Sequence, residues 1–148
     1  EPRRADALEA RDTAARVGSS SMSRWNALTR AELDLEEAGL DDAQRARVLR
    51  ELGVRRLLVG DADGGRRDLE RALSLAPGDR EARLALAGAL RSDPARVLEH
   101  ARAAAAPGAP ARVRAAAERL ACDAALELGD LKAARRAAQR AQELAPDD

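Results

Sequence analysis

The feature that most constrains the fold is a pattern of residues that occurs twice in the chain, 69 positions apart. Each copy begins with Gly-Asp, at Gly60-Asp61 and again at Gly129-Asp130, and each ends with Ala-Pro, at Ala76-Pro77 and again at Ala145-Pro146. An Ala and a Leu also occupy matching positions between these ends. Because a fixed spacing of this kind is typical of a repeated structural unit, we expect a repeat architecture in place of one irregular core.

The composition between these landmarks favours helices throughout. Ala, Leu, Arg and Glu dominate and are strong helix formers, whereas β-branched residues are few. Asp, Gly and Pro divide the chain into helices of about three to five turns, since Asp caps a helix start and Gly or Pro ends a helix. The predicted helices span residues 42–59, 65–75, 80–90, 94 to 103–106, 110–128 and 131–144. The sequence therefore predicts an all-α fold.

The spacing and the residues within it resemble the tetratricopeptide repeat, whose period of about 34 residues is close to half of the observed spacing. In the first unit the resemblance runs through Leu49, Leu52-Gly53, Gly60-Asp61, Leu69, Ala72 and Pro77. In the last unit Ala121-Cys122 takes the place of Leu-Gly. The sequence departs from the family pattern at Arg56 and Gly65, where a bulky and a small apolar residue are expected, and it lacks the family's large aromatics. The resemblance covers roughly the last hundred residues and implies a right-handed solenoid of antiparallel helical hairpins.

We expect residues 1–148 to form one helical-repeat domain. Residues 46–79 form repeat 1, residues 80–109 a shortened repeat 2, and residues 110–148 repeat 3. Residues 1–45 hold one or two further helices, over 3–17 and 23–38, which form a degenerate fourth hairpin in one interpretation. In the other, residues 1–17 are a loosely attached segment joined by the serine-rich stretch at 18–21.

Charge and composition argue against two classes of partner. The formal net charge is +0, from 26 basic and 26 acidic residues, and Trp25 is the only aromatic residue, which disfavours nucleic-acid binding. No apolar run approaches the roughly 20 residues that span a bilayer, so we expect no membrane insertion. A single cysteine leaves the redox compartment open, with the cytoplasm slightly favoured over the periplasm. The abundance of Arg, Ala, Gly and Pro, with Lys132 as the only lysine, is typical of a GC-rich bacterial genome.

Residues that could carry chemistry are sparse, and we expect neither an enzyme nor a cofactor or metal site. His100 is the only histidine. Cys122 is interpreted as a buried, inert thiol at a position where helices pack. The acidic stretch from Asp61 to Gly65 lacks the closing glutamate of a calcium loop, and is interpreted as a turn between helices.

A repeat stack offers a binding surface by its geometry, because the first helices of successive hairpins line a groove. One stripe on each of these helices does not face the partner helix of its own hairpin. The predicted groove residues are Arg47, Arg50, Val54, Leu57, Leu84, Arg91, Arg119, Asp123 and Leu126. Apolar residues ringed by arginines suit a helix or extended peptide with acidic flanks. The alternative is that these arginines are simply solvated and that residues 1–45 cover the apolar side chains.

Two functions are therefore predicted. The first is a non-catalytic adaptor or scaffold that binds a partner peptide or helix in the groove. The second is a self-associating structural or regulatory domain of a larger enzyme or transcription regulator. The alanine-rich last helix predicts weak end-to-end self-association if Ala133 and Ala137 face outward, whereas otherwise these alanines belong to the hairpin core.

Overall fold

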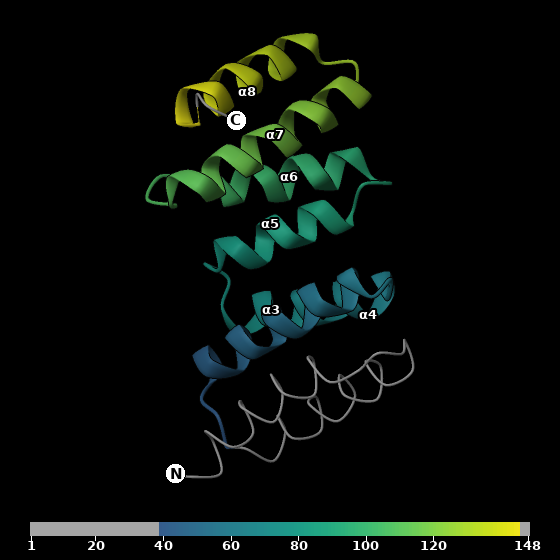
Figure 1. The fold of residues 1–148 in the computed structure, drawn as a ribbon, viewed down its shortest axis with the longest axis vertical. Coiled ribbons are helices and arrows are strands. Elements are labelled where there is room, and N and C mark those ends of the chain that lie inside the picture. The colour runs from purple at the N-terminus through teal and green to yellow at the C-terminus, as the bar shows by residue number, and fades with distance from the viewer. Residues whose placement is uncertain (1–38, 146–148) are drawn as a thin grey trace. The chain divides into compact units, whose positions relative to one another are not determined.

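The computed structural model describes residues 39–145, and every regular element in this part of the chain is an α-helix (Figure 1). The helices are α3 (Asp42–Leu58), α4 (Ala62–Leu75), α5 (Arg80–Ala89), α6 (Pro94–Ala104), α7 (Ala111–Glu127) and α8 (Leu131–Leu144). The all-α prediction is confirmed. None of these helices is both long and apolar enough to cross a membrane. The expectations for residues 1–38 lie outside the described residues.

Aspartate side chains fix where five of the six helices begin. Each accepts a hydrogen bond from the backbone N–H three residues further on, which satisfies a donor that the first turn would leave without a partner. The capping residues are Asp41, Asp61, Asp79, Asp93 and Asp130. The predicted boundaries agree with the structure to within a few residues. The largest difference is at α4, which begins at Ala62 and not near Gly65, because Asp61 accepts from the N–H of Gly64 at 2.9 Å.

The chain divides into two compact units, Glu1–Ala76 and Pro77–Asp148. Within the described residues, the first unit contains the hairpin of α3 and α4, and the second contains α5 to α8. We describe each unit by itself, and the expectation of a single domain over residues 1–148 stays a prediction.

The α3–α4 hairpin is held together by a close approach of two backbones. A Cβ atom on Gly53 would lie 2.9 Å from the carbonyl oxygen of Gly65, and one on Gly65 would lie 2.8 Å from the carbonyl oxygen of Gly53. The two helices therefore approach each other closely at Gly53. This contact also explains why glycine occupies position 65, where the repeat pattern led us to expect a small apolar residue. Leu52 and Leu69 are fully buried on either side of this crossing.

Arg56, which differs from the bulky apolar residue of the tetratricopeptide pattern, takes part in a buried ion pair. Its Nη1 donates to Oδ2 of Asp68 on α4 at 2.8 Å, and the two side chains are only 8% and 2% exposed. The Nε of Arg56 also faces Oδ2 of Asp61 at 3.8 Å, beyond hydrogen-bond distance. Two opposite charges thus replace the apolar contact expected here, and each offsets the cost of burying the other.

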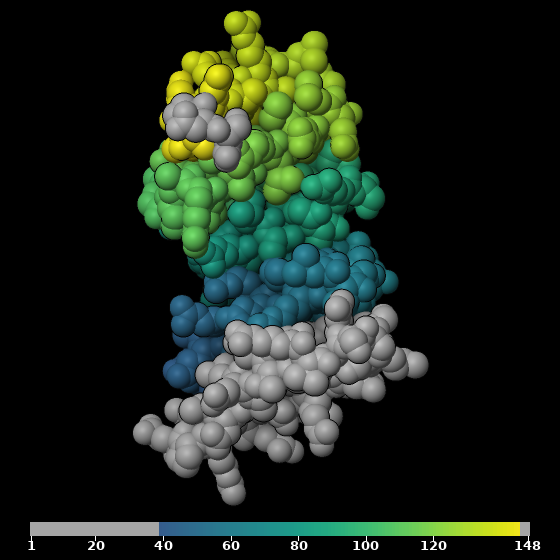
Figure 2. Space-filling model, viewed as in Figure 1, coloured from purple at the N-terminus to yellow at the C-terminus, as the bar shows by residue number. Residues whose placement is uncertain are grey.

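In the second unit each helix packs on the next one along the chain, in the order seen from teal to yellow in Figures 1 and 2. Helix α5 also contacts α7, whereas α6 and α8 both pack on α7 without contacting each other. Arg112 of α7 donates to Glu81 of α5 at 3.1 Å, and Arg80 of α5 donates to the carbonyl oxygen of Pro107, in the turn before α7, at 2.8 Å. The core of this unit consists largely of alanines, which allow the helices to approach closely.

The last hairpin joins α7 to α8 through alanines and one ion pair. Ala134, Ala137 and Ala141 of α8 are buried and Ala133 is half-buried, whereas Ala138 is exposed. Of the two alternatives for Ala133 and Ala137, their burial agrees with the hairpin core and not with an outward-facing stripe, because this stripe of α8 turns toward the other helices of the unit. Beside it, Arg140 donates to both carboxylate oxygens of Glu118, at 2.7 and 2.9 Å.

Candidate functional site

The predicted groove residues of the first unit all lie on α3 but differ in exposure. Arg47 is exposed, and Arg50 and Val54 are half-buried. Leu57 is also half-buried, and its side chain lies against Gly65 of α4, where an added Cβ would come within 2.7 Å of it. Leu57 therefore contacts the partner helix of its own hairpin and contributes only part of its surface to any open face.

In the second unit the predicted residues lie on the paired helices α5 and α7 and at the end of α5. Leu84 is half-buried on α5, whereas Arg91 is exposed just after that helix. Arg119, Asp123 and Leu126 are exposed on α7. The structure brings Arg91, Arg119 and Asp123 to two adjoining hollows, which we describe in turn.

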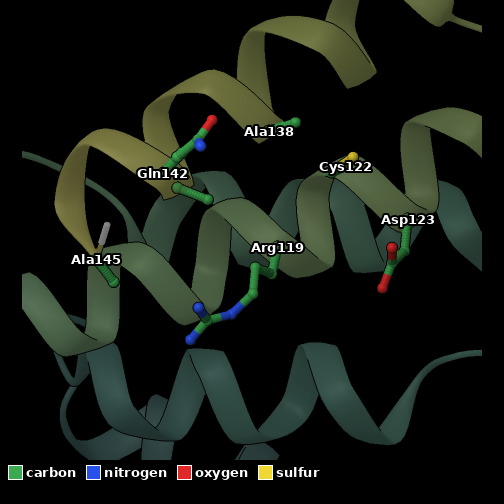
Figure 3. A pocket seen from close by; sticks show the side chains of 7 residues that line it. Arg119, Cys122, Asp123, Ala138, Gln142 and Ala145 are labelled. Carbon is green, nitrogen blue, oxygen red and sulfur yellow. The ribbon is translucent and has the colours of Figure 1, made fainter. Parts of the chain in front are cut away.

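The first hollow, called here the α7–α8 hollow, has a volume of about 350 Å³ (Figure 3). It is lined by Arg119, Cys122, Asp123, Ala138, Ala141, Gln142 and Ala145. Arg119 and Asp123 project from the same side of α7, whereas Cys122 lies nearer to α8. The floor is thus made of small side chains, and two opposite charges spaced by one helical turn border it.

The second hollow, called here the α6–α7 hollow, is smaller, at about 60 Å³. It is lined by Arg91, Pro94, Val97, Leu120, Asp123, Ala124 and Glu127. Asp123 lines both hollows, so the two adjoin along α7. We call the surface formed by both hollows the docking face.

The sequence repeat explains why the α7–α8 hollow exists. Cys122 and Ala138 occupy the positions that Gly53 and Leu69 occupy in the first hairpin, 69 residues earlier. There, Leu69 lies against Gly53 and is fully buried. In the last hairpin the large side chain is replaced by Ala138, which leaves the space open. Cys122 is therefore half-buried at the edge of the hollow, and not fully buried as predicted.

Three exposed leucines lie close together in sequence around the turn between α7 and α8. Leu126, Leu128 and Leu131 are between 48% and 71% exposed. Leu126 was predicted as a groove residue, but it lines neither hollow of the docking face. Leu120 and Gln142 also line the docking face, but they were not among the predicted residues because no charge or spacing signal sets them apart.

The described residues offer no metal site, since no three His, Cys, Asp or Glu side chains among residues 39–145 lie close enough together to hold an ion. His100 is half-buried on α6 and lines none of the hollows described here.

Comparison with known proteins adds no family to this description. The chain matches no protein-family model, and no curated protein sequence is significantly similar to it. The resemblance to tetratricopeptide repeats therefore rests on the residues and spacing given above.

Proposed function

We propose that this chain is a tetratricopeptide-like binding module that docks a partner helix on the face formed by the α7–α8 and α6–α7 hollows. The observation that carries the proposal is the meeting of Arg91, Arg119 and Asp123, predicted from sequence as groove residues, around two adjoining hollows. A surface with small apolar floors and a few placed charges is a common form of peptide-binding site.

The packing of the second unit supports a groove on this side. The first helices of its two hairpins, α5 and α7, contact each other, whereas the second helices, α6 and α8, do not. A stack whose first helices are closer together than its second helices curves toward the first helices. We therefore propose that the α5–α7 side is concave, as in a helical solenoid.

The docking face also defines the chemistry of its partner. Ala138, Ala141 and Ala145 admit a close approach, which favours a helix with small apolar residues on its contacting side. Arg119 suits a carboxylate, since a guanidinium can donate two parallel hydrogen bonds to it. Asp123, one turn further along α7, suits a basic side chain. We therefore propose an amphipathic helix with an acidic and a basic residue spaced by about one turn.

Selection from a library of displayed helical peptides tests this proposal. Peptides that bind the wild-type chain should share a small apolar stripe with an acidic residue beside it. Charge reversal by Arg119→Glu should weaken their binding by about tenfold, which corresponds to the ~1.4 kcal/mol expected for losing a charge-assisted contact. Changing the peptide's acidic residue to lysine should restore binding to this variant.

Arg135→Glu is the matched control, because Arg135 is an exposed arginine on α8 that lines none of the hollows described here. It changes the net charge of the chain by the same amount and should leave peptide binding within twofold of wild type, as a rough bound for a distant surface charge. Equal loss in both variants, or no loss in Arg119→Glu, would show that the peptides bind elsewhere.

A further inference from the structure

A third hollow of about 150 Å³ lies on the other side of the α7–α8 contact and shares no residue with the docking face. We call it the arginine hollow. It is lined by Leu98, Arg102, Ala121, Ala133, Arg136, Ala137 and Arg140. Helices α6 and α8 both pack on α7 without contacting each other. The space between α6 and α8 therefore stays open next to Ala121 of α7, and this space is the arginine hollow.

The lining of the arginine hollow has three cations and no carboxylate. One of the three, Arg140, is neutralised by Glu118, to which its Nε and Nη2 donate at 2.7 and 2.9 Å. This hydrogen bond raises the pKa of the Arg140 guanidinium above its ordinary value, with burial acting in the opposite direction. The pair also holds Arg140 in one orientation, with its Nη1 group outside the contact.

The other two cations have no such partner. Neither Arg102 of α6 nor Arg136 of α8 forms a side-chain hydrogen bond or ion pair with any other residue in the described range 39–145. Two guanidinium groups from separate helices thus border one small concave space. The two guanidinium groups repel each other, and an anion bound between them would be attracted to both.

We propose that the arginine hollow binds a phosphate group, either as free phosphate or as a phosphate monoester. Arginine forks match the tetrahedral oxygens of phosphate and donate paired hydrogen bonds to them. The hollow is also large enough for a small anion, because its volume of about 150 Å³ is several times what a single water molecule requires.

The alanines of the hollow strengthen such a site. Ala121, Ala133 and Ala137 present no competing acceptor, and they reduce the access of water to one side of the bound group. Hydrogen bonds between charged partners are stronger where water is partly excluded. The site is independent of the proposed peptide-docking face, so either can be absent without affecting the other.

Titration followed by nuclear magnetic resonance tests the proposal on the full chain at low ionic strength. Inorganic phosphate and glycerol 3-phosphate are added separately, and the amide signals of Ala133 and Ala137 are followed. At least one of the two should bind saturably and shift these signals, and the tighter of the two identifies the source of the phosphate group. Arg136→Gln and Arg102→Gln should each weaken binding by about tenfold, as expected for the loss of one charged hydrogen-bond donor.

Arg135→Gln removes the same charge from the same helix, at a residue outside the arginine hollow, and should change the affinity by less than about twofold. All three substituted side chains are exposed, so the helical circular dichroism of each variant should match wild type. Linear, non-saturable shifts with both ligands would overturn the proposal, as would equal weakening in Arg135→Gln and Arg136→Gln. Equal affinity for citrate at the same ionic strength would overturn the assignment to phosphate in favour of an unspecific anion effect.

Discussion

Removing one partner of the buried pair between Arg56 and Asp68 is the perturbation whose result the structure defines best. Both side chains are less than a tenth exposed, and their charged atoms are 2.8 Å apart. Taking away one member of such a pair deprives the other buried charge of its closest counter-ion, which typically costs about 3–5 kcal/mol. We therefore expect Asp68→Ala and Arg56→Met each to lower the free energy of unfolding by about this amount.

The double variant Arg56→Met/Asp68→Ala should be far less destabilised than the sum of the two single variants. Replacing a buried ion pair by apolar groups is often nearly neutral, because the cost of dehydrating both charges disappears together with their attraction. The chain itself contains such a replacement. In the last hairpin the corresponding positions, 69 residues later, hold Ala125 and Ala137, and both alanines are buried.

Urea unfolding followed by circular dichroism gives the four free energies of this double-mutant cycle. Hydrogen exchange of the α3 and α4 amides shows in addition whether the loss is local to the first hairpin. We expect a coupling energy of at least about 2 kcal/mol between the two positions, at the upper part of the range for residues in direct contact. Single variants that lose less than about 1 kcal/mol and add up in the double variant would refute the reasoning, since the pair would then behave as a solvated surface contact.

Two further predictions concern the same hairpin and helix α5. Leu52→Ala should cost about 2–5 kcal/mol in urea unfolding, because Leu52 is fully buried and its truncation leaves a cavity, and an unchanged midpoint would contradict its place in the core. Gly65→Ala should also be destabilising, because the new Cβ would lie less than 3 Å from Leu57 and from the carbonyl oxygen of Gly53. The same change at Gly88 of α5 would bring the new Cβ within 4 Å of nothing. Gly88→Ala should instead stabilise the folded chain by about 0.5–1 kcal/mol, because alanine lowers the backbone entropy of the unfolded chain. Melting temperatures that shift in the same direction for Gly65→Ala and Gly88→Ala would contradict this difference between the two sites.

The helix pattern was predictable because its signals are local. Each capping aspartate acts on a backbone N–H three residues away, and Gly60 and Gly129 end their helices with φ values of 91° and 74°, which side chains other than glycine rarely adopt. Information of this kind is contained within a few neighbouring residues. It does not depend on how the helices later pack.

The ion pairs and the hollows were not predictable, because they depend on which stripes of different helices meet. Arg56 stood out only as an exception to the repeat pattern, and its partner Asp68, 12 residues later, was not singled out at all, yet the two compensate each other across the hairpin. The arginine hollow unites residues of α6, α7 and α8, and the spacing along any one helix gives no sign of it. The α7–α8 hollow was partly predictable, because Arg119 and Asp123 share a stripe on α7, while its depth depends on the small size of Ala138 in α8.

The reactivity of Cys122 tests the proposed docking face most directly. Cys122 is the only cysteine of the chain, and it is half-buried in the lining of the α7–α8 hollow, so alkylation reports on access to this hollow alone. A selected helical peptide is titrated against the wild-type chain, and the rate of Cys122 alkylation is measured at each concentration. We predict that the rate falls in proportion to peptide occupancy, and that phosphate, which we place in the separate arginine hollow, leaves it unchanged. An alkylation rate that stays constant while the peptide saturates the chain would contradict the proposed function.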